Sequence, residues 1–351
     1  LPSDNENVNS LAAKGLARLK DPDMPGLMSE EAEKLIQIGN TRDHFHELED
    51  CDWIAEAVVE RLDIKQSLYQ RLNENCKKSA IITSNTSTIP ISLLTQGMPK
   101  EFCERFAITH FFNPVRFMRL LELVRGEFTT DDVINTLDLF TERMLGKGVV
   151  SCSDTPGFLG NRVGVFAIQC ALHKAFEYKL SPTEADAFFG RPLGLPKTGV
   201  FGLYDLIGID LMADVVKSLV SILPEKDAFH QYSRPIEIMT DMIANGQTGN
   251  KNEKGFYKQL GDERQVLDLS SRNYVAHERL KTPLLEAAEK AGVSFIIKDK
   301  SAYGLYIWDV IAETLCYAAS LVPEVTDDLT QIDDAMKLGY NWVKGPFELL
   351  D

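Results

Sequence analysis

The sequence predicts a doubly wound α/β domain followed by an all-helical domain that contains a duplicated unit. Between about residues 45 and 153, short apolar runs alternate with amphipathic stretches, which is typical of a parallel sheet covered by helices. After Asp154 the strand-like runs end and helical periodicity takes over. Two similar segments lie within this second half, and such self-similarity indicates a repeated structural unit.

Composition narrows the class of protein. The chain has 351 residues, 44% of them hydrophobic and 25% charged, which is ordinary for a soluble globular protein of two or three domains. Its net charge of −15 argues against a nucleic-acid partner, because neutralising phosphates needs clustered Lys and Arg. The sequence contains no run of about 18 apolar residues, so no membrane-spanning helix is expected. The six cysteines lack CxxC spacing, which favours reduced thiols in the cytoplasm over a metal site or a disulfide framework.

The α/β part follows two acidic helical segments, 10–20 and 28–39, for which Ser10 and Ser29 are candidate N-caps. Strands are expected at 52–59, 79–85, 105–112, 118–125 and 147–153, and long helices at 61–76 and 129–145. The strand over 118–125 follows its predecessor too closely for a crossover helix. We therefore expect these two strands to be antiparallel.

The helical part contains the repeat. Helices are expected at 156–179, 181–190, 204–220 and 235–246. Residues 182–206 and 329–351 each show an acidic helix, a glycine, a loop, Gly-Val-Phe or Gly-Pro-Phe, and a Leu/Asp pair. Since the second copy stops at Asp351, we expect a chain clipped at its C-terminus. The polar stretch after residue 258 is expected to be a linker.

These observations give three predicted domains. Residues 1–153 form an α/β domain, residues 154–258 a first helical domain, and residues 259–351 a linker with a truncated second helical domain.

A histidine and a glutamate stand in adjacent apolar strands. His110 ends the run RFAITH, and Glu122 lies inside RLLELV. A lone histidine at such a place is more often a satisfied core residue, but a carboxylate in an apolar strand is costly unless it is paired. A contact between the two would satisfy both and would raise the basicity of the imidazole, as a general base requires. The pattern allows a buried structural pair or a catalytic dyad.

Other polar residues also lie where ligands bind in open α/β folds, at the carboxyl ends of strands. Five consecutive hydroxyl or amide residues, Ser84 to Thr88, follow one buried run. They predict either a capped turn or a set of donors that lines a pocket. Asn161 lies in an apolar helix and must find partners there. It predicts either a tether between helix and loop or a ligand contact.

The segments SNTST, HFFNPV, LLELV, DTPGFLGNR and KGFYK, in this order and at these intervals, resemble the L-3-hydroxyacyl-CoA dehydrogenase family. The resemblance covers about residues 45–258, and the repeat extends it to 351. The second helical unit is similar to the multidomain bacterial β-oxidation type. The resemblance implies a Rossmann-like NAD-binding domain, an all-α domain, and oxidation of L-3-hydroxyacyl-CoA to 3-ketoacyl-CoA with NAD. Implied partners are the acyl-CoA substrate and either a second copy or a fused or associated enoyl-CoA hydratase.

The resemblance implies four catalytic residues. Its serine in SNTS matches Ser87, which would bind the 3-hydroxyl or 3-keto oxygen of the substrate. Its histidine matches His110, the base, and its glutamate matches Glu122. Its asparagine matches Asn161, which would orient the substrate carbonyl. These roles agree with elementary chemistry, because the oxygen needs donors, the proton an acceptor and the imidazolium a counter-charge.

The resemblance also implies the residues that contact NAD. They are Glu60 and Lys65 after the AVVE strand, Ser87, Asn113 after HFF, and Lys251. Around Lys251 the sequence is KNEKGF, where the family has KTGxGF. No residue is assigned to a metal.

One family feature is absent from the sequence. No GxGxxG occurs, the motif that in the family follows the first strand and holds the pyrophosphate at a helix N-terminus. The acidic residue that would bind the adenosine ribose is missing too. Leu1 falls about where the second strand should have finished. We expect a domain that lacks its first βαβ unit and has an unpaired sheet edge.

Two other functions stay open from the sequence. One keeps the fold and the cofactor but acts on a hydroxy acid without CoA. The other is a non-catalytic scaffold, against which a buried carboxylate argues because a scaffold has no need of one.

The missing glycine motif leads to a prediction about cofactor affinity. The 351-residue chain should bind NADH weakly or not at all, because no glycine-rich turn cradles the pyrophosphate. Isothermal titration of this chain with NADH measures the affinity directly. A dissociation constant in the micromolar range would refute the prediction.

Overall fold

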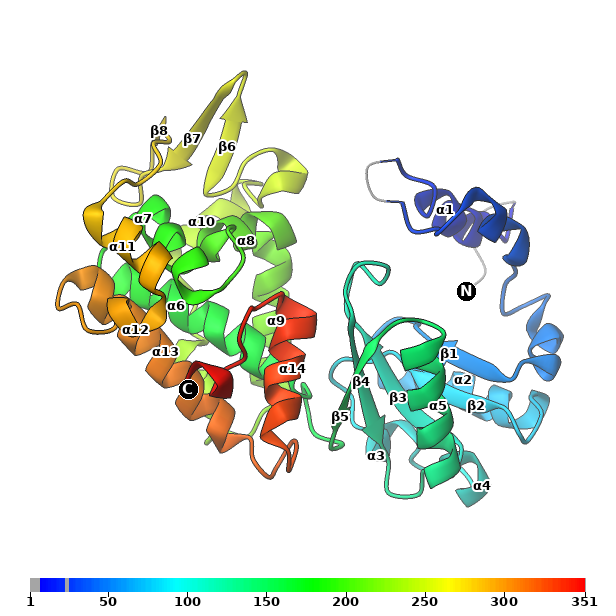
Figure 1. Ribbon diagram of the computed structural model, residues 1–351. Coiled ribbons are helices and arrows are strands. Elements are labelled where there is room, and N and C mark those ends of the chain that lie inside the picture. The colour runs from blue at the N-terminus through cyan, green and yellow to red at the C-terminus, as the bar shows by residue number, and fades with distance from the viewer. Residues whose placement is uncertain (1–6, 23–24, 351) are drawn as a thin grey trace. The chain divides into compact units, whose positions relative to one another are not determined.

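The computed structural model describes residues 7–22 and 25–350. The chain divides into two compact units, residues 1–155 and 156–351. The first unit contains a five-stranded sheet, and the second is mainly helical (Figure 1). Within the described ranges, no helix is long and apolar enough to cross a membrane.

A five-stranded sheet lies at the centre of the first unit. Its strands, in the spatial order β1-β2-β3-β4-β5, are Trp53–Glu56, Ile81–Ser84, Phe106–Phe111, Leu120–Arg125 and Gly148–Cys152. Neighbouring strands are parallel except β3 and β4, which are antiparallel. All five predicted strands are present, and the antiparallel pairing predicted for 118–125 is confirmed.

Helices pack on both faces of this sheet. The helices that follow β1 in the first unit are α2 (Leu62–Asn75), α3 (Ile91–Leu94), α4 (Lys100–Cys103) and α5 (Asp131–Arg143). Leu137 of α5 packs against Ala107 of β3. The preceding residue of β3, Phe106, contacts Tyr69 of α2, with ring centroids 5.1 Å apart. Because consecutive strand residues point to opposite faces, α5 and α2 cover the two sides of a doubly wound sheet.

The segments before the sheet correct two expectations. Helix α1 (Ser10–Arg18) is present, but its N-cap is Asn9 and not Ser10. The helix expected over 28–39 is only the 3-10 helix Glu30–Leu35. Ser29 caps it as predicted, but none of its residues is buried, so no tertiary packing supports a longer helix. A second 3-10 helix spans Phe45–Asp50.

Glu56 forms a buried polar cluster at the end of β1. Its carboxylate accepts hydrogen bonds from Lys65 Nζ at 2.9 and 3.1 Å, Tyr69 Oη at 2.6 Å and Ser84 Oγ at 2.7 Å. Burial acts to raise the pKa of Glu56, but the hydrogen bonds from these three side chains outweigh it and lower the pKa. The cluster therefore joins β1, α2 and β2 through one ionised carboxylate.

This cluster predicts a pH-dependent stability. A lowered pKa means that Glu56 stabilises the fold above its ordinary pKa of 4.5, and that this contribution is lost as the pH falls through the lowered value. Glu56→Gln should lower the free energy of unfolding by about 3 kcal/mol at pH 7, because it leaves the Lys65 ammonium without its main counter-charge. The difference should shrink at acidic pH.

Urea denaturation followed by Trp53 fluorescence measures this loss, with Trp308 and Trp342 of the second unit replaced by phenylalanine. The exposed Glu127 of the same unit offers a matched control, and Glu127→Gln should leave the curve unchanged. Equal stability of Glu56→Gln and the parent at pH 7 would contradict the prediction.

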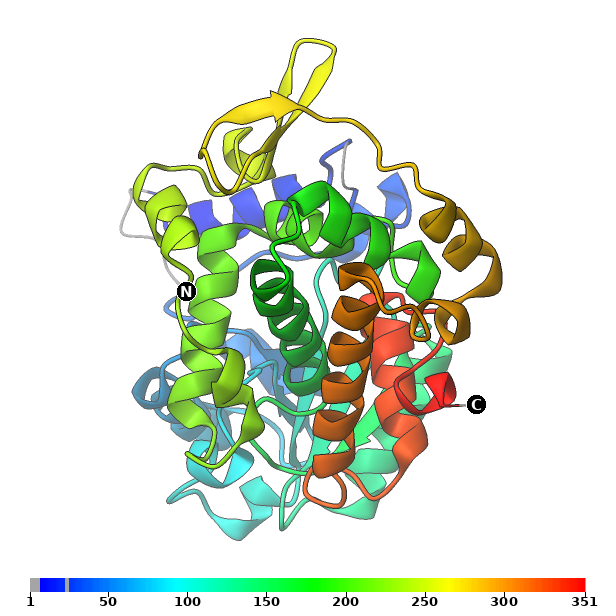
Figure 2. The same ribbon diagram turned by 90° about the vertical axis from the view of Figure 1, so that its left-hand side faces the viewer.

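The second unit consists mainly of helices, with a small sheet at its edge (Figure 1). Its helices are α6 (Phe166–Glu177), α7 (Pro182–Phe188), α8 (Gly199–Ile207), α9 (Ile209–Ile222), α10 (Glu237–Ala244), α11 (Pro283–Ala291), α12 (Val293–Ile296), α13 (Ala302–Ser320) and α14 (Leu329–Tyr340). A π-helical segment, Gly160–Val165, leads into α6. Figures 1 and 2 show α6 and α13 side by side, and their contact includes a parallel stack of Phe166 on Tyr317 with centroids 4.1 Å apart.

The expectation that strands end after Asp154 was wrong. A three-stranded antiparallel sheet follows α10, with β6 (Tyr257–Leu260), β7 (Glu263–Leu267) and β8 (Tyr274–Ala276). Part of the expected linker is therefore regular structure. Most residues of these strands are polar or exposed, so they lack the apolar alternation that marks a half-buried strand.

The helix expected over 204–220 is two helices. Helix α8 ends at Ile207 and α9 begins at Ile209. Gly208 separates them with φ of 110°, a conformation that side chains disfavour. The glycine therefore breaks a stretch whose periodicity is otherwise continuous.

The two copies of the repeat share one contact. In the first copy, Asp186 Oδ1 accepts a hydrogen bond from the backbone N–H of Phe201 at 2.7 Å. In the second copy, Asp333 Oδ1 accepts one from Phe347 at 2.8 Å. The glycine two residues before each phenylalanine lies against the aspartate, where any Cβ would clash. A helix aspartate that caps a Gly-x-Phe turn is thus the signature of the repeated unit.

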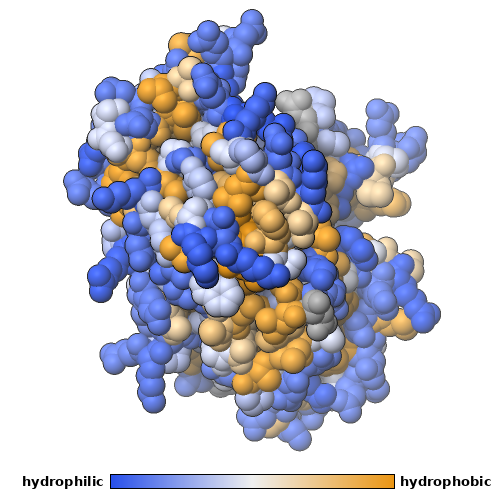
Figure 3. All heavy atoms as spheres, turned by 60° about the vertical axis from the view of Figure 1, so that its left-hand side comes forward, coloured by the Kyte–Doolittle hydropathy of each residue, from blue (hydrophilic) through white to orange (hydrophobic). Residues whose placement is uncertain are grey.

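The surface of the second unit carries several exposed apolar side chains. Among them, Trp308 is 51% exposed and Val343 is 74% exposed. Figure 3 shows that hydrophobic residues gather in patches on one face, between hydrophilic residues.

Candidate active site

His110 and Glu122 form a buried pair at the antiparallel step of the sheet. The register of β3 and β4 places the two residues directly opposite each other. His110 Nδ1 lies 2.6 Å from Glu122 Oε2. His110 is 9% exposed and Glu122 is fully buried. An ionised carboxylate can only accept, so Nδ1 is the donor and Nε2 is the basic nitrogen of the ring.

The polar residues after β2 divide into two groups. Four of them hold the loop: Ser84 donates to Glu56, Asn85 Oδ1 accepts from the N–H of Phe111, and Thr86 and Thr88 donate to Glu60. Ser87 is half-buried and, in the part of the chain that the structure describes, its hydroxyl has no hydrogen-bond partner. The loop is therefore a capped turn that leaves Ser87 available to a ligand.

The residues expected to contact NAD in this unit differ in their surroundings. Lys65 is 1% exposed, and besides Glu56 its ammonium contacts Glu60 Oε2 at 3.2 Å. Glu60 thus holds together Lys65, Thr86 and Thr88 at the carboxyl ends of β1 and β2. Asn113 is exposed just after β3.

This donor set fits one end of NAD. A carboxylate, hydroxyls and an amide at adjacent strand ends are suited to the ribose hydroxyls and the carboxamide of a nicotinamide nucleoside. Glu60, Ser87 and Asn113 would hold that end. Lys65, which is buried and contacts Glu56 and Glu60, would position Glu60 and would not touch the cofactor itself. The pyrophosphate requires a glycine-rich turn, which the sequence does not contain.

Asn161 and Lys251 belong to the helical unit. Asn161 lies in the π-helical segment and is half-buried. Segments of this kind are frequent at functional sites. Lys251 Nζ contacts Asp210 Oδ1 at 2.7 Å and Oδ2 at 2.6 Å on the surface, so its charge is engaged by a carboxylate.

Arg162, next to Asn161, is a residue that the sequence reading missed. Its side chain is almost fully buried and ion-paired with Asp227 and with Glu324 Oε1, the latter at 3.0 Å. Its Nε donates to Tyr317 Oη at 2.9 Å. The sequence does show an arginine inside an apolar helical stretch. Like the carboxylate of Glu122 in its apolar strand, such a charge must find partners. Arg162 anchors the segment that carries Asn161.

The chain matches known sequences over most of its length. Residues 3–155 match the NAD binding domain of 3-hydroxyacyl-CoA dehydrogenase, and residues 157–259 match the C-terminal domain of the same enzyme. A "Probable 3-hydroxyacyl-CoA dehydrogenase" of Deinococcus radiodurans is 36% identical over 74% of this chain and 74% of its own length. A "Putative fatty acid oxidation complex trifunctional enzyme" of Rickettsia prowazekii is 37% identical over 100% of this chain and 48% of its own length. The chain thus spans about half the length of that relative.

The fold matches as well. A crystal structure of 3-hydroxybutyryl-CoA dehydrogenase from Escherichia coli superposes with a TM-score of 0.71 over 99% of this chain and 84% of that chain, at 23% identity. Sequence and fold agree on an NAD-binding α/β domain followed by a helical C-terminal domain. The chain belongs to the 3-hydroxyacyl-CoA dehydrogenase family.

Proposed function

We propose that the protein oxidises L-3-hydroxyacyl-CoA esters to 3-ketoacyl-CoA in fatty-acid β-oxidation, with NAD as cofactor. The observation that carries the proposal is the buried contact of 2.6 Å between His110 Nδ1 and Glu122 Oε2. A buried carboxylate that fixes a histidine tautomer is the arrangement of a general base and its orienting partner.

The proposed chemistry divides between the chain and its cofactor. NAD, when bound, supplies the hydride acceptor. His110 Nε2 takes the proton of the 3-hydroxyl, and Glu122 stabilises the imidazolium that forms. Ser87 and Asn161 donate hydrogen bonds to the substrate oxygens. Because a donor aimed at developing charge stabilises the transition state, Ser87 would act on the 3-oxygen itself.

The proposal also covers the cellular compartment, the partner proteins and the domain boundaries. The cytoplasm fits six cysteines that are all free thiols. A second copy, or a fused or associated enoyl-CoA hydratase, is the proposed partner. The division of the helical unit into domains at residues 154–258 and 259–351 is part of the proposal too.

The catalytic role of the dyad is tested by Glu122→Gln. The amide oxygen can still accept from Nδ1, but it cannot neutralise an imidazolium. The kcat for oxidation of NADH by acetoacetyl-CoA, measured at millimolar NADH, should fall about 10²- to 10⁴-fold with KM little changed. Circular dichroism should show an unchanged fold.

The control is Glu127→Gln, the same substitution at an exposed position of the same unit. It should leave kcat unchanged. Near-normal turnover of a folded Glu122→Gln variant would contradict the proposal that His110 is the base and Glu122 its partner.

The substrate class is tested by comparing a CoA ester with its free acid. If the proposal holds, kcat/KM for acetoacetyl-CoA exceeds that for acetoacetate by a factor on the order of 10² or more, since binding energy from the CoA part is used at the reacting centre. Equal values for ester and acid would instead identify a hydroxy-acid dehydrogenase that does not use CoA. No turnover of either compound by folded protein that is shown to bind NADH would favour the scaffold.

A further inference from the structure

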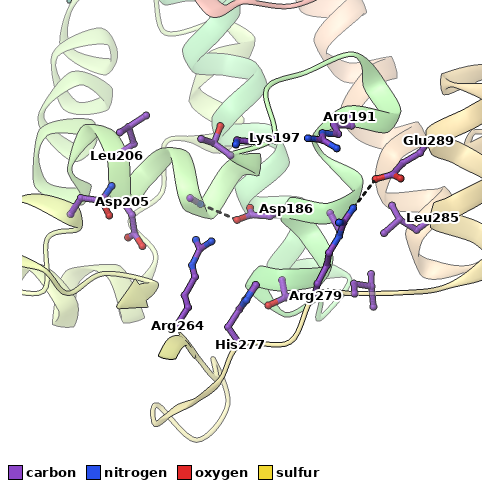
Figure 4. A pocket seen from close by; sticks show the side chains of 16 residues that line it. Asp186, Arg191, Lys197, Asp205, Leu206, Arg264, His277, Arg279, Leu285 and Glu289 are labelled. Atoms are coloured by element: carbon purple, nitrogen blue, oxygen red, sulfur yellow. Dashed lines mark hydrogen bonds and ion pairs between the residues drawn. The ribbon is translucent and has the colours of Figure 1, made fainter. Parts of the chain in front are cut away.

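The helical unit contains a cavity of about 470 Å³ that is separate from the residues assigned above. Its walls come from the loop between α7 and α8, from β7 and the segment after β8, and from α11. Figure 4 shows basic side chains that reach it from opposite walls. They are Arg191 and Lys197 on one side, and Arg264, His277 and Arg279 on the other.

Three of these cations make no ion pair in the part of the chain that the structure describes. In the described ranges, Arg191 and Lys197 have no hydrogen-bond or ion-pair partner for their side chains. The guanidinium of Arg264 lies over the ring of Tyr257, 4.2 Å from its centroid. It makes no ion pair in those same ranges, although its charge acts on the Asp205 carboxylate. Only Arg279 is paired, with Glu289 at 3.7 Å. The chain has a net charge of −15, whereas three cations without ion pairs lie around this one cavity. The local charge there is therefore opposite in sign to that of the whole chain.

The cavity also has three acidic wall residues. Glu289 pairs with Arg279, and the other two, Asp186 and Asp205, are engaged by backbone N–H groups. Asp186 accepts hydrogen bonds from the backbone N–H groups of Phe201 and Gly202 at 2.7 and 3.0 Å. Asp205 accepts from those of Phe256 and Tyr257 at 2.8 and 2.7 Å. Burial raises the pKa of Asp186 to about 7 and that of Asp205 to about 6. These carboxylates therefore hold the walls together and repel an anion less than solvated ones would.

We propose that this cavity is an anion site that binds a phosphorylated ligand of the diphosphate or bisphosphate class. Arginine presents a planar fork of donors that matches phosphate oxygens, and lysine adds a point charge. Three unpaired cations suit a ligand with more than two negative charges. The volume lies within the range of roughly 300–1,000 Å³ that is usual for small-ligand sites. The hydroxyls of Thr183 and Thr198 add neutral donors.

Two sources carry this chemistry: a free diphosphate and a nucleotide with two phosphate groups. Titration of the full chain with pyrophosphate and with adenosine 3′,5′-bisphosphate, at low ionic strength, distinguishes them. At least one probe should bind more tightly than about 1 mM. Equal affinities would identify the phosphates as the recognised part, and tighter binding of the nucleotide would identify a phosphorylated nucleotide.

Variants locate the binding. Arg191→Gln and Lys197→Gln should each weaken it about tenfold or more, the size expected when one charge-assisted contact is lost. Lys226→Gln is the matched control, because Lys226 is an exposed lysine of the same unit that does not line the cavity. It should change the affinity less than twofold. All three variants should keep the dehydrogenase kinetics of the parent, so this test is independent of the proposed function.

The proposal is overturned if neither probe binds below the millimolar range. It is equally overturned if a probe binds but Arg191→Gln and Lys197→Gln leave its affinity unchanged. That result would place the anion elsewhere on the chain.

Discussion

An ionised side chain taken out of water costs several kcal/mol unless partners surround it, and this constraint governs where the protein can place its charges. Glu122 sits in the middle of β4 because the antiparallel register puts His110 opposite it. Glu56 ends β1 because Lys65, Tyr69 and Ser84 converge on its carboxylate. In the sheet unit, the buried charges therefore tie together the strands and helices that carry the candidate site.

The helical unit obeys the same constraint with different donors. Asp186 and Asp333 are satisfied by backbone N–H groups of a following Gly-x-Phe turn, so each copy of the repeat closes on itself. Arg162 is satisfied by partners from outside its own helix, and two of them, Tyr317 and Glu324, lie in or just after α13. Local caps thus shape each copy, and one long-range cluster joins the start of the helical unit to α13 and the loop after it.

Elements with strong periodicity were predictable, and so was the core of the site. The five strands of the first sheet are apolar runs, and the carboxylate of Glu122 inside the apolar strand β4 indicated a partner on the neighbouring strand, where His110 lies. Strands β6 to β8 escaped prediction because most of their residues are polar or exposed, so no apolar alternation marks them in the sequence. The partners of Arg162 could not be read from the sequence, since two of them lie 155 and 162 residues away. The cationic cavity likewise depends on segments that only the folded chain brings together.

The contacts of Arg162 with distant residues also set an order of events during synthesis of the chain. Of its three partners, Asp227 is translated soon after it, whereas Tyr317 and Glu324 come more than 150 residues later. Until residue 324 has left the ribosome, the guanidinium cannot be fully compensated inside the helical unit and is more stable in water. The segment that presents Asn161 therefore reaches its final form only after the chain has been made to Glu324, just before the second copy begins, which makes completion of this segment a late step in the biogenesis of the protein.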